Sequence, residues 1–203
     1  MSSASQALTM RGVVERKGYG ADGLGFWTLV KEDLATYRGD WTRPGFRALF
    51  VYRFGVARFG FPALIRKPMT LLYRMMQRHV RNHYGIEMYD TATIGRRLEI
   101  GHQGAIVIHE YAVIGNDCTI RQAVTIGAAG SWSATTAPIL GDHVDVGAGA
   151  KILGKIKVGD NTRIGPNVVL MTDLPAGAIA FVEPPRVLHL KARPDVRADP
   201  GRA

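Results

Sequence analysis

The chain has 203 residues, 46% of them hydrophobic, and a formal net charge of +9, which is enough apolar content for one large domain with its own core. A single cysteine excludes an intrachain disulfide and indicates a reducing compartment. The first 30 residues lack the apolar run of a secretory signal. The window Phe46–Ile65 holds three arginines, each costing about 3 kcal/mol at a bilayer centre, which excludes a transmembrane helix there. We therefore expect a cytoplasmic protein.

The N-terminal part is predicted to be helical after a polar start. Residues 1–22 are rich in Ser, Gly and charge, and we expect them to be disordered. Apolar residues at helical spacing then predict helices over Gly25–Arg38, Trp41–Gly60 and Pro62–Tyr84, so that residues 23–85 form a helical domain. In the last helix a basic stripe runs beside apolar residues, as in an amphipathic surface helix or on the solvated side of a packed one. The stripe consists of Lys67, Arg74, Arg78 and Arg81.

The positive charge lies wholly in this N-terminal part. Residues 1–85 carry 14 Lys or Arg and 5 Asp or Glu, which gives +9, whereas residues 86–203 carry 12 of each. Such asymmetry indicates either an acidic partner or a solvated basic face. The acidic partners to consider are a membrane surface, a phosphorylated carrier and nucleic acid. Of these we favour contact with the inner face of a membrane, and we expect no nucleic acid.

From Ile94 onward an aliphatic residue, usually followed by glycine, recurs every six residues. Neither a helix nor an alternating strand has this period. It is typical of a parallel β-helix of hexapeptide repeats, in which each repeat forms one strand and one corner and the aliphatic residue points into the core. We expect about four coils between Met88 and Pro175, within a β-helix domain over residues 86–187, and a flexible tail over 188–203. The recurring positions are Ile94, Ile100, Ile106, Ile114, Ile120, Ile126, Leu140, Val146, Ile152, Val158, Ile164 and Leu170.

The period slips twice. Two extra residues are assigned to Ile106–Val113, and a longer insertion occupies Gly127–Ile139. Insertions in repeat proteins map to loops on one face, which is often the binding face. Cys118 falls on an inward small-residue position and is predicted to fill the core rather than to act as a nucleophile.

Of the six histidines, His102 is the best candidate for chemistry. It follows the recurring position Ile100 on a corner, and a neutral imidazole suits general-base work near pH 7. Glu87 lies fifteen residues earlier, close to one coil, so we expect it one layer below, where a carboxylate can orient the imidazole. Spacing alone also allows a structural histidine at this position. His102, His109 and His143 lack the tight spacing of metal ligands, so no metal is expected.

The segment Gly85–Val187 resembles the serine acetyltransferase family of left-handed β-helix acyltransferases. Residues 147–154 (GAGAKILG) match that family's signature, and residues 85–88 (GIEM) and 102–107 (HQGAIV) fall where the family has its acidic residue and its catalytic histidine. The resemblance implies an α+β chain with a helical N-terminal domain followed by a left-handed parallel β-helix. It also implies that His102 is the general base and Glu87 its partner.

The resemblance further implies acetyl-CoA as the co-substrate, lying in the groove between two β-helices of a homotrimer, with paired trimers as a further arrangement. Backbone groups of small residues would contact the cofactor, and two cations would hold its phosphates. The matching positions are Gly127, Ala128, Ala148, Lys151, Arg163, Gly165 and Pro166. On the acceptor side the matching positions are Asp33, Gly101 and Gln103.

This acceptor side departs from the family. Gly101 stands where the family has Asp before its histidine, and the loop Ser133–Pro138 lacks the Arg-His pair that precedes the family's proline. A site for a zwitterion should keep its charged partners. Residues 39–41 and 48–55 also resemble the branch found with exopolysaccharide and capsule synthesis. We therefore expect an O-acetyltransferase acting on a saccharide hydroxyl, with L-serine O-acetylation and a catalytically inactive scaffold as the alternatives.

Overall fold

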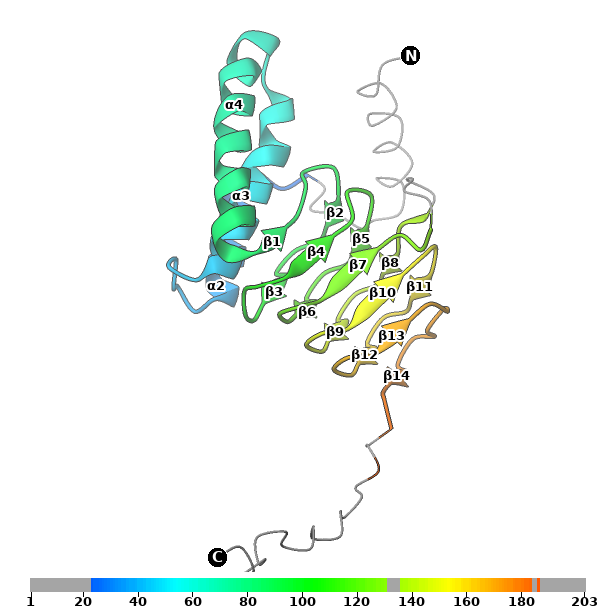
Figure 1. Cartoon of the computed structure of the whole chain (residues 1–203). Helices are drawn as coiled ribbons and strands as arrows, with labels where there is room; N and C mark the ends of the chain where they lie inside the picture. Colours follow the sequence, from blue (N-terminus) through cyan, green and yellow to red (C-terminus); the bar gives the residue numbers. More distant parts are fainter. Residues whose placement is uncertain (1–22, 131–135, 184–185, 187–203) are drawn as a thin grey trace, which may run out of the picture.

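The computed structural model describes residues 23–130, 136–183 and 186. A group of helices stands at one end of a stack of short strands (Figure 1). The segments 1–22 and 188–203, for which the sequence predicts disorder and a flexible tail, lie outside the described residues.

The three predicted helices are confirmed, with shorter bounds. They are α2 (Phe26–Thr36), α3 (Pro44–Ala57) with the 3-10 turn η2 (Arg58–Gly60), and α4 (Ala63–His79) with the π-helical turn η3 (Val80–Tyr84). After α2, Arg38 and Gly39 have φ angles of 55° and 80°, a left-handed pair that prevents the helix from continuing. Pro44 begins α3 because proline is preorganised for the first helical turn. Among the described residues, no helix is long and apolar enough to cross a bilayer.

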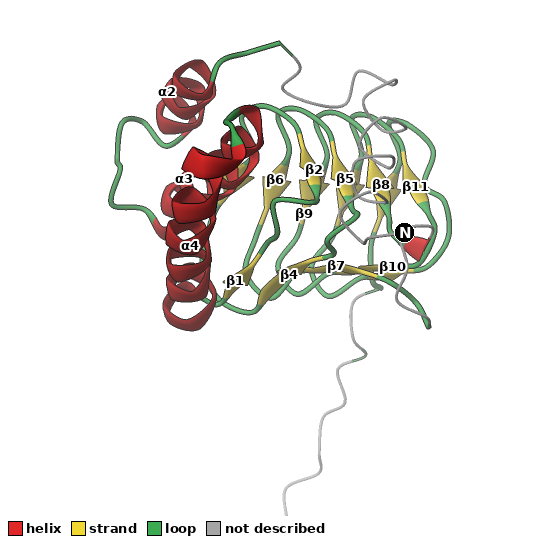
Figure 2. Cartoon of the chain, turned by 90° about the horizontal axis from the view of Figure 1, so that it is seen from above, coloured by secondary structure: helices red, strands yellow, loops and turns green. Residues whose placement is uncertain are grey.

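The strands pair in parallel and form three sheets that wrap into a β-helix (Figure 2). Sheet 1 has the order β1-β4-β7-β10-β13, sheet 2 β11-β8-β5-β2, and sheet 3 β14-β12-β9-β6-β3. The predicted helices followed by a parallel β-helix are thus confirmed. The strand bounds are β1 Ile86–Glu87, β2 Thr93–Ile94, β3 Glu99–Ile100, β4 Ile106–Ile108, β5 Val113–Ile114, β6 Thr119–Ile120, β7 Thr125–Gly127, β8 Ile139–Leu140, β9 Asp145–Val146, β10 Lys151–Leu153, β11 Lys157–Val158, β12 Arg163–Ile164, β13 Val169–Leu170 and β14 Ile179–Ala180.

The core consists of the aliphatic residues that recur every six positions. All twelve are at most 7% exposed, which confirms the prediction. Ile94, Ile114 and Leu140 illustrate the stacking, because each pairs in register with the next coil. Cys118 is 1% exposed, as predicted for a core filler, and its burial raises the pKa of the thiol to about 12.

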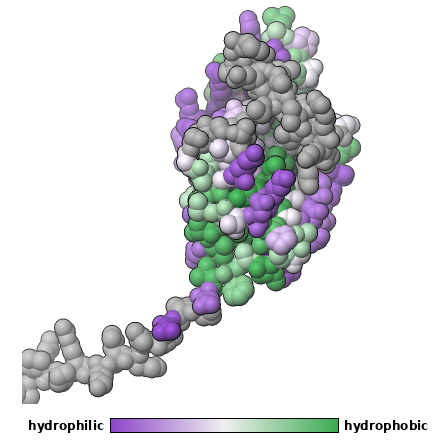
Figure 3. All heavy atoms as spheres, turned by 90° about the vertical axis from the view of Figure 1, so that its right-hand side faces the viewer, coloured by the Kyte–Doolittle hydropathy of each residue, from purple (hydrophilic) through white to green (hydrophobic). Residues whose placement is uncertain are grey.

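The surface of the β-helix is not uniformly polar. Figure 3 shows a face on which broad apolar areas surround a few hydrophilic side chains. In the last coils, large apolar side chains are more than half exposed. They include Val169, Met171, Ile179 and Phe181.

The helices close the open end of the β-helix. There the first coil would otherwise present unpaired backbone N–H and C=O groups, which are costly to bury without partners. Helical side chains supply the partners over distances of 2.6–3.1 Å. They are Tyr37, Tyr52, Arg53 and Tyr73, which bond backbone groups of Ile100, Ala92, Ile94, Gly95 and Asp90.

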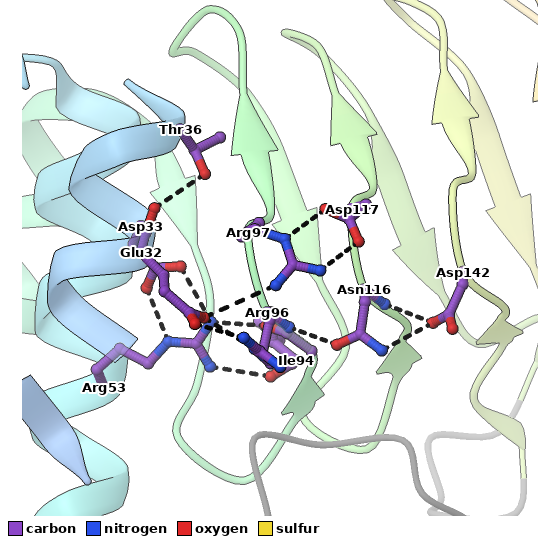
Figure 4. A network of polar contacts seen from close by, with 11 residues as sticks. Glu32, Asp33, Thr36, Arg53, Ile94, Arg96, Arg97, Asn116, Asp117 and Asp142 are labelled. Carbon is purple, nitrogen blue, oxygen red and sulfur yellow. Dashed lines mark hydrogen bonds and ion pairs between the residues drawn. The ribbon is translucent and has the colours of Figure 1, made fainter. Parts of the chain in front are cut away.

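A polar ladder along the corner between sheets 2 and 3 ties α2 to the first coils (Figure 4). Arg96 donates from Nε to Glu32 at 2.8 Å, and Arg97 donates from Nε to Asp117 at 2.6 Å. The hydrogen bond from Arg96 lowers the pKa of Glu32, and that from Arg97 lowers the pKa of Asp117.

The first slip in the six-residue period lies earlier than predicted. Ile100 pairs with Ile120, and Val107 pairs with Thr125, so the six residues 101–106 stand opposite only four, 121–124. The Gly101 N–H bonds to Ile120 and the Ala123 N–H bonds to Gly104, which confines the two extra residues to positions 102–104. The assignment to Ile106–Val113 was wrong because Ile106 and Ile108 are both buried. The sequence pattern does not tell which of the two stacks on Ile126.

Candidate active site

His102 lies in a bulge at the corner where the chain passes from sheet 3 to sheet 1. The two extra residues widen this corner, whereas the equivalent corners of the following coils, 121–124, 147–150 and 165–168, have four residues each. His102 and Gln103 are both exposed. The bulge therefore presents the imidazole to solvent at the edge of the first coil, where a substrate can reach it.

Glu87 lies beside this corner on the outer side of sheet 1. Glu87 belongs to β1 and pairs with Val107 of β4, so it lies on the strand that precedes the first full coil. Its Oε1 accepts a hydrogen bond from the Tyr89 hydroxyl at 2.6 Å, and this bond raises the pKa of Tyr89. Within the part of the chain that the structure describes, no hydrogen bond or ion pair joins Glu87 to His102. Tyr89 is thus a partner of Glu87 that the sequence did not reveal, since its only signal is its place two residues further along.

The small residues predicted to contact the cofactor, Gly127, Ala128, Ala148, Gly165 and Pro166, fall on the two edges of sheet 1. The same stack of corners as that of His102 contains Ala148 and the Gly165-Pro166 pair. Backbone hydrogen bonds join these corners from coil to coil: the Asn167 N–H bonds to the Ala148 carbonyl at 2.9 Å, the Gly149 N–H to the Gln122 carbonyl, and the Ala123 N–H to the Gly104 carbonyl. Gly127 instead ends β7 and Ala128 follows it, at the opposite edge. One subunit therefore does not bring all of these residues to one place.

The stacked corners pack closely on one another and are flanked by cations. A Cβ added to Gly147 would lie 2.6 Å from the Pro166 nitrogen, so the coils approach too closely for a larger residue. Lys151 projects from sheet 1, where its Nζ donates to the Ala123 carbonyl, and Arg163 is exposed on sheet 3. Small residues between two cations suit a narrow ligand that carries phosphates.

Asp33 does not fit the predicted role of a substrate contact. It is 1% exposed, and both carboxylate oxygens are bonded by Arg53, from Nε at 2.8 Å and from Nη2 at 3.3 Å (Figure 4). The Asp33–Arg53 pair joins α2 to α3 over the first coil. The pattern of residues 31–34 could not reveal this, because the partner lies twenty residues further along the chain.

Arg121 is a residue of this corner that sequence reasoning missed. The pairing of Ile100 with Ile120 places Gly101 directly against Arg121 in the next coil. A Cβ added to Gly101 would lie 3.9 Å from the Arg121 Cγ. The Arg121 Nη1 donates to Asp145 and, at 3.4 Å, to the Val146 carbonyl. The coil register, had it been known, would have revealed the contact.

The repeat and the fold define a hexapeptide-repeat transferase. A family model described as bacterial transferase hexapeptide (six repeats) matches residues 137–171. A serine acetyltransferase from Helicobacter pylori is 42% identical over 156 residues, which cover 75% of this chain and 87% of that protein. The chain therefore belongs to the serine acetyltransferase family and is an acyltransferase.

Solved structures agree with this assignment. Serine acetyltransferase isoform 3 from Entamoeba histolytica, in complex with cysteine, matches with a TM-score of 0.67 at 29% identity, over 82% of this chain and 61% of that one. Soybean serine acetyltransferase complexed with serine matches with a TM-score of 0.67 at 28% identity, over 80% and 69%. These neighbours confirm the predicted helical domain followed by a left-handed β-helix.

The predicted saccharide acceptor and exopolysaccharide branch are wrong. The relative at 42% identity is named a serine acetyltransferase, and a structural neighbour is complexed with serine. The error came from reading the uncharged Gly101 and the loop before Pro138 as loss of a zwitterion site. That reading considered only residues close to His102 in the sequence and left out its neighbours in the next coil, of which Arg121 is one. Residues 133–135 of that loop lie outside the described residues.

Proposed function

We propose that this protein is a serine O-acetyltransferase that converts L-serine and acetyl-CoA to O-acetylserine and CoA. The observation that carries the proposal is the 42% identity to a serine acetyltransferase over 87% of that protein. The exposed His102 bulge, in a segment that resembles the family's catalytic motif, supports the proposal.

In the proposed mechanism His102 is the general base. Its imidazole removes the proton from the serine hydroxyl as the oxygen attacks the thioester carbonyl, which gives a tetrahedral oxyanion. Collapse of this species breaks the C–S bond, and the departing thiolate takes a proton from the imidazolium. Glu87 stabilises the cationic imidazole, and Tyr89 in turn holds one Glu87 oxygen by its hydrogen bond. No covalent enzyme intermediate is needed.

Acetyl-CoA would lie along the stacked corners above His102. Backbone groups of small residues would contact its extended arm, and Lys151 and Arg163 would hold its phosphates, because both lie beside this edge. The residues we propose are Gly127, Ala128, Ala148, Lys151, Arg163, Gly165 and Pro166.

We propose a homotrimer because the cofactor residues occupy both edges of sheet 1. In a trimer the edge with Gly127 and Ala128 of one subunit can face the His102 edge of the next, which completes one groove. The exposed apolar side chains of the β-helix (Figure 3) suit burial between subunits. Sedimentation equilibrium tests this, and a stable, active monomer would contradict it.

We also propose that the cytoplasmic enzyme contacts an anionic membrane surface through α4. Residues 41–86 contain nine Lys or Arg and no Asp or Glu. The outward side of α4 exposes Leu64 (86%), Leu71 (64%) and Met75 (63%), and Lys67, Arg74 and Arg78 lie beside them. Co-sedimentation with phosphatidylserine vesicles, and not with phosphatidylcholine vesicles, is expected. Equal recovery with both would reject the contact.

Thiol release from acetyl-CoA, with O-acetylserine identified by mass spectrometry, tests the proposed function. Wild-type protein should transfer acetyl to L-serine, and His102→Ala should lower kcat at least about 100-fold while the oligomer remains folded. Glu87→Gln should lower kcat less, since the base survives. Near wild-type transfer by folded His102→Ala protein would remove the assignment of His102, and no transfer by wild-type protein would reject serine.

A further inference from the structure

The corner at His102 lacks an obvious positively charged partner for the carboxylate of serine among its own residues. Gly101 and Gln103, the neighbours of His102, carry no charge, and Asp33 is buried against Arg53. An acceptor hydroxyl must come within hydrogen-bond reach of the His102 imidazole. The carboxylate of L-serine lies only two carbon atoms from that hydroxyl, so it must be bound close to the same corner.

Arg121 is placed to meet this carboxylate. Stacked parallel strands lie about 4.8 Å apart, and the register sets Arg121 on the coil next to Gly101, the residue immediately before His102. Gly101 has no side chain, and even an added Cβ would lie 3.9 Å from the nearest atoms, the Arg121 Cγ and the Ile120 carbonyl oxygen. The missing side chain therefore leaves space between the imidazole bulge and the arginine.

The guanidinium is held on one side and has donors to spare. Nη1 donates to Asp145 and to the Val146 carbonyl, both in β9, the strand on the other side of Arg121 from Gly101. Among the described residues no partner bonds Nε or Nη2. The side chain of Arg121 is 39% exposed and that of Asp145 is 41% exposed, so solvent and small ligands can reach the pair. A planar guanidinium with two free donors matches a carboxylate in a bidentate arrangement.

We propose that Arg121 binds the carboxylate of the amino-acid acceptor and that Asp145 holds the guanidinium in place. This inference rests on the proposed function, because it names how the same site recognises serine. It also explains how the corner can bind a carboxylate although positions 101 and 103 are uncharged. Arg121 acts on acceptor binding and leaves the proton transfer by His102 unchanged.

Direct binding tests the proposal independently of turnover. Calorimetric titration of the full-length protein with L-serine and with L-serinamide, which lacks the carboxylate, should show wild-type protein binding L-serine at least about tenfold more tightly. Arg121→Gln should abolish this preference. Equal binding of the two ligands by wild-type protein, or a preference that survives in Arg121→Gln, would overturn the proposal alone. Absent binding of L-serine by wild-type protein would reject the proposal together with the proposed function.

Kinetics and two control variants separate ligand binding from a structural role. Arg121→Gln should raise KM for serine about 10- to 100-fold, with kcat and the KM for acetyl-CoA within about threefold. Asp145→Asn removes the negative charge of the pair but keeps the guanidinium and an oxygen that accepts its hydrogen bond, so it should retain most of the preference for L-serine. Arg97→Gln removes a comparably exposed arginine paired with Asp117 at another corner and should change neither constant. If Asp145→Asn matches Arg121→Gln, the role is structural and the proposal fails. If wild-type protein prefers L-serine in the titration but does not acetylate it, the proposed function fails.

Discussion

Replacing Arg53 with methionine should strongly destabilise the junction between the helices and the β-helix. Arg53 is 3% exposed and bonds Asp33, which is 1% exposed, together with the Ile94 carbonyl at 3.0 Å and the Gly95 carbonyl at 2.6 Å. Methionine would leave a buried carboxylate without its counter-charge and two carbonyls without donors. Removing one partner of a buried ion pair costs about 3–5 kcal/mol.

Urea unfolding followed by circular dichroism, at one fixed protein concentration because subunit association contributes to stability, measures this loss. Arg43→Met is the matched control, since it removes an Arg–Asp pair whose side chains are 60% and 44% exposed, which should cost at most about 1 kcal/mol. The double variant Asp33→Leu/Arg53→Met removes the buried charge as well and should be more stable than Arg53→Met alone. A loss below about 1 kcal/mol for Arg53→Met, or a double variant less stable than the single one, would refute the reasoning.

Three further outcomes follow from the same structure. Gly115→Ala should lower stability by about 1–3 kcal/mol, because its Cβ would lie 2.5 Å from the Gly141 carbonyl carbon. Gly101→Ala should be tolerated, because the atoms nearest to its added Cβ are 3.9 Å away. Equal melting temperatures of the two variants would contradict this. The Cys118 thiol, whose pKa is raised to about 12 by burial, should not react with a disulfide reagent at pH 8 until urea is added, and rapid stoichiometric labelling of folded protein would show that the thiol is accessible. The pKa values of Glu32 and Asp117 are lowered by Arg96 and Arg97, so their contribution to stability is present above the ordinary carboxyl pKa of about 4 and is lost as the pH falls through the lower folded-state values. Glu32→Gln should therefore show a smaller fall in melting temperature between pH 7 and pH 3 than wild type, and identical slopes would count against the Arg96 contact.

The site was predicted from the sequence only in part. The corner position of His102 and the placement of Glu87 near the first coil followed from the repeat and from the family motif. The widening of that corner was assigned to the wrong segment, and Tyr89 and Arg121 were not identified. Asp33 was assigned to the acceptor by motif, although its carboxylate is bonded to Arg53.

The sequence by itself determined the β-helix. A six-residue period of aliphatic residues can be satisfied only if every sixth residue is inward, and all twelve such positions are buried. The burial of these positions can be predicted because it depends only on residue identity and on a spacing of six residues. Tertiary structure decided what depends on the register between coils, such as the bulge at residues 102–104 and the approach of Arg121 to Gly101. It also decided the helical cap, in which Asp33 is neutralised by Arg53. These contacts join residues about twenty positions apart, and the hydrogen-bond register and packing that bring them together exist only in the folded chain.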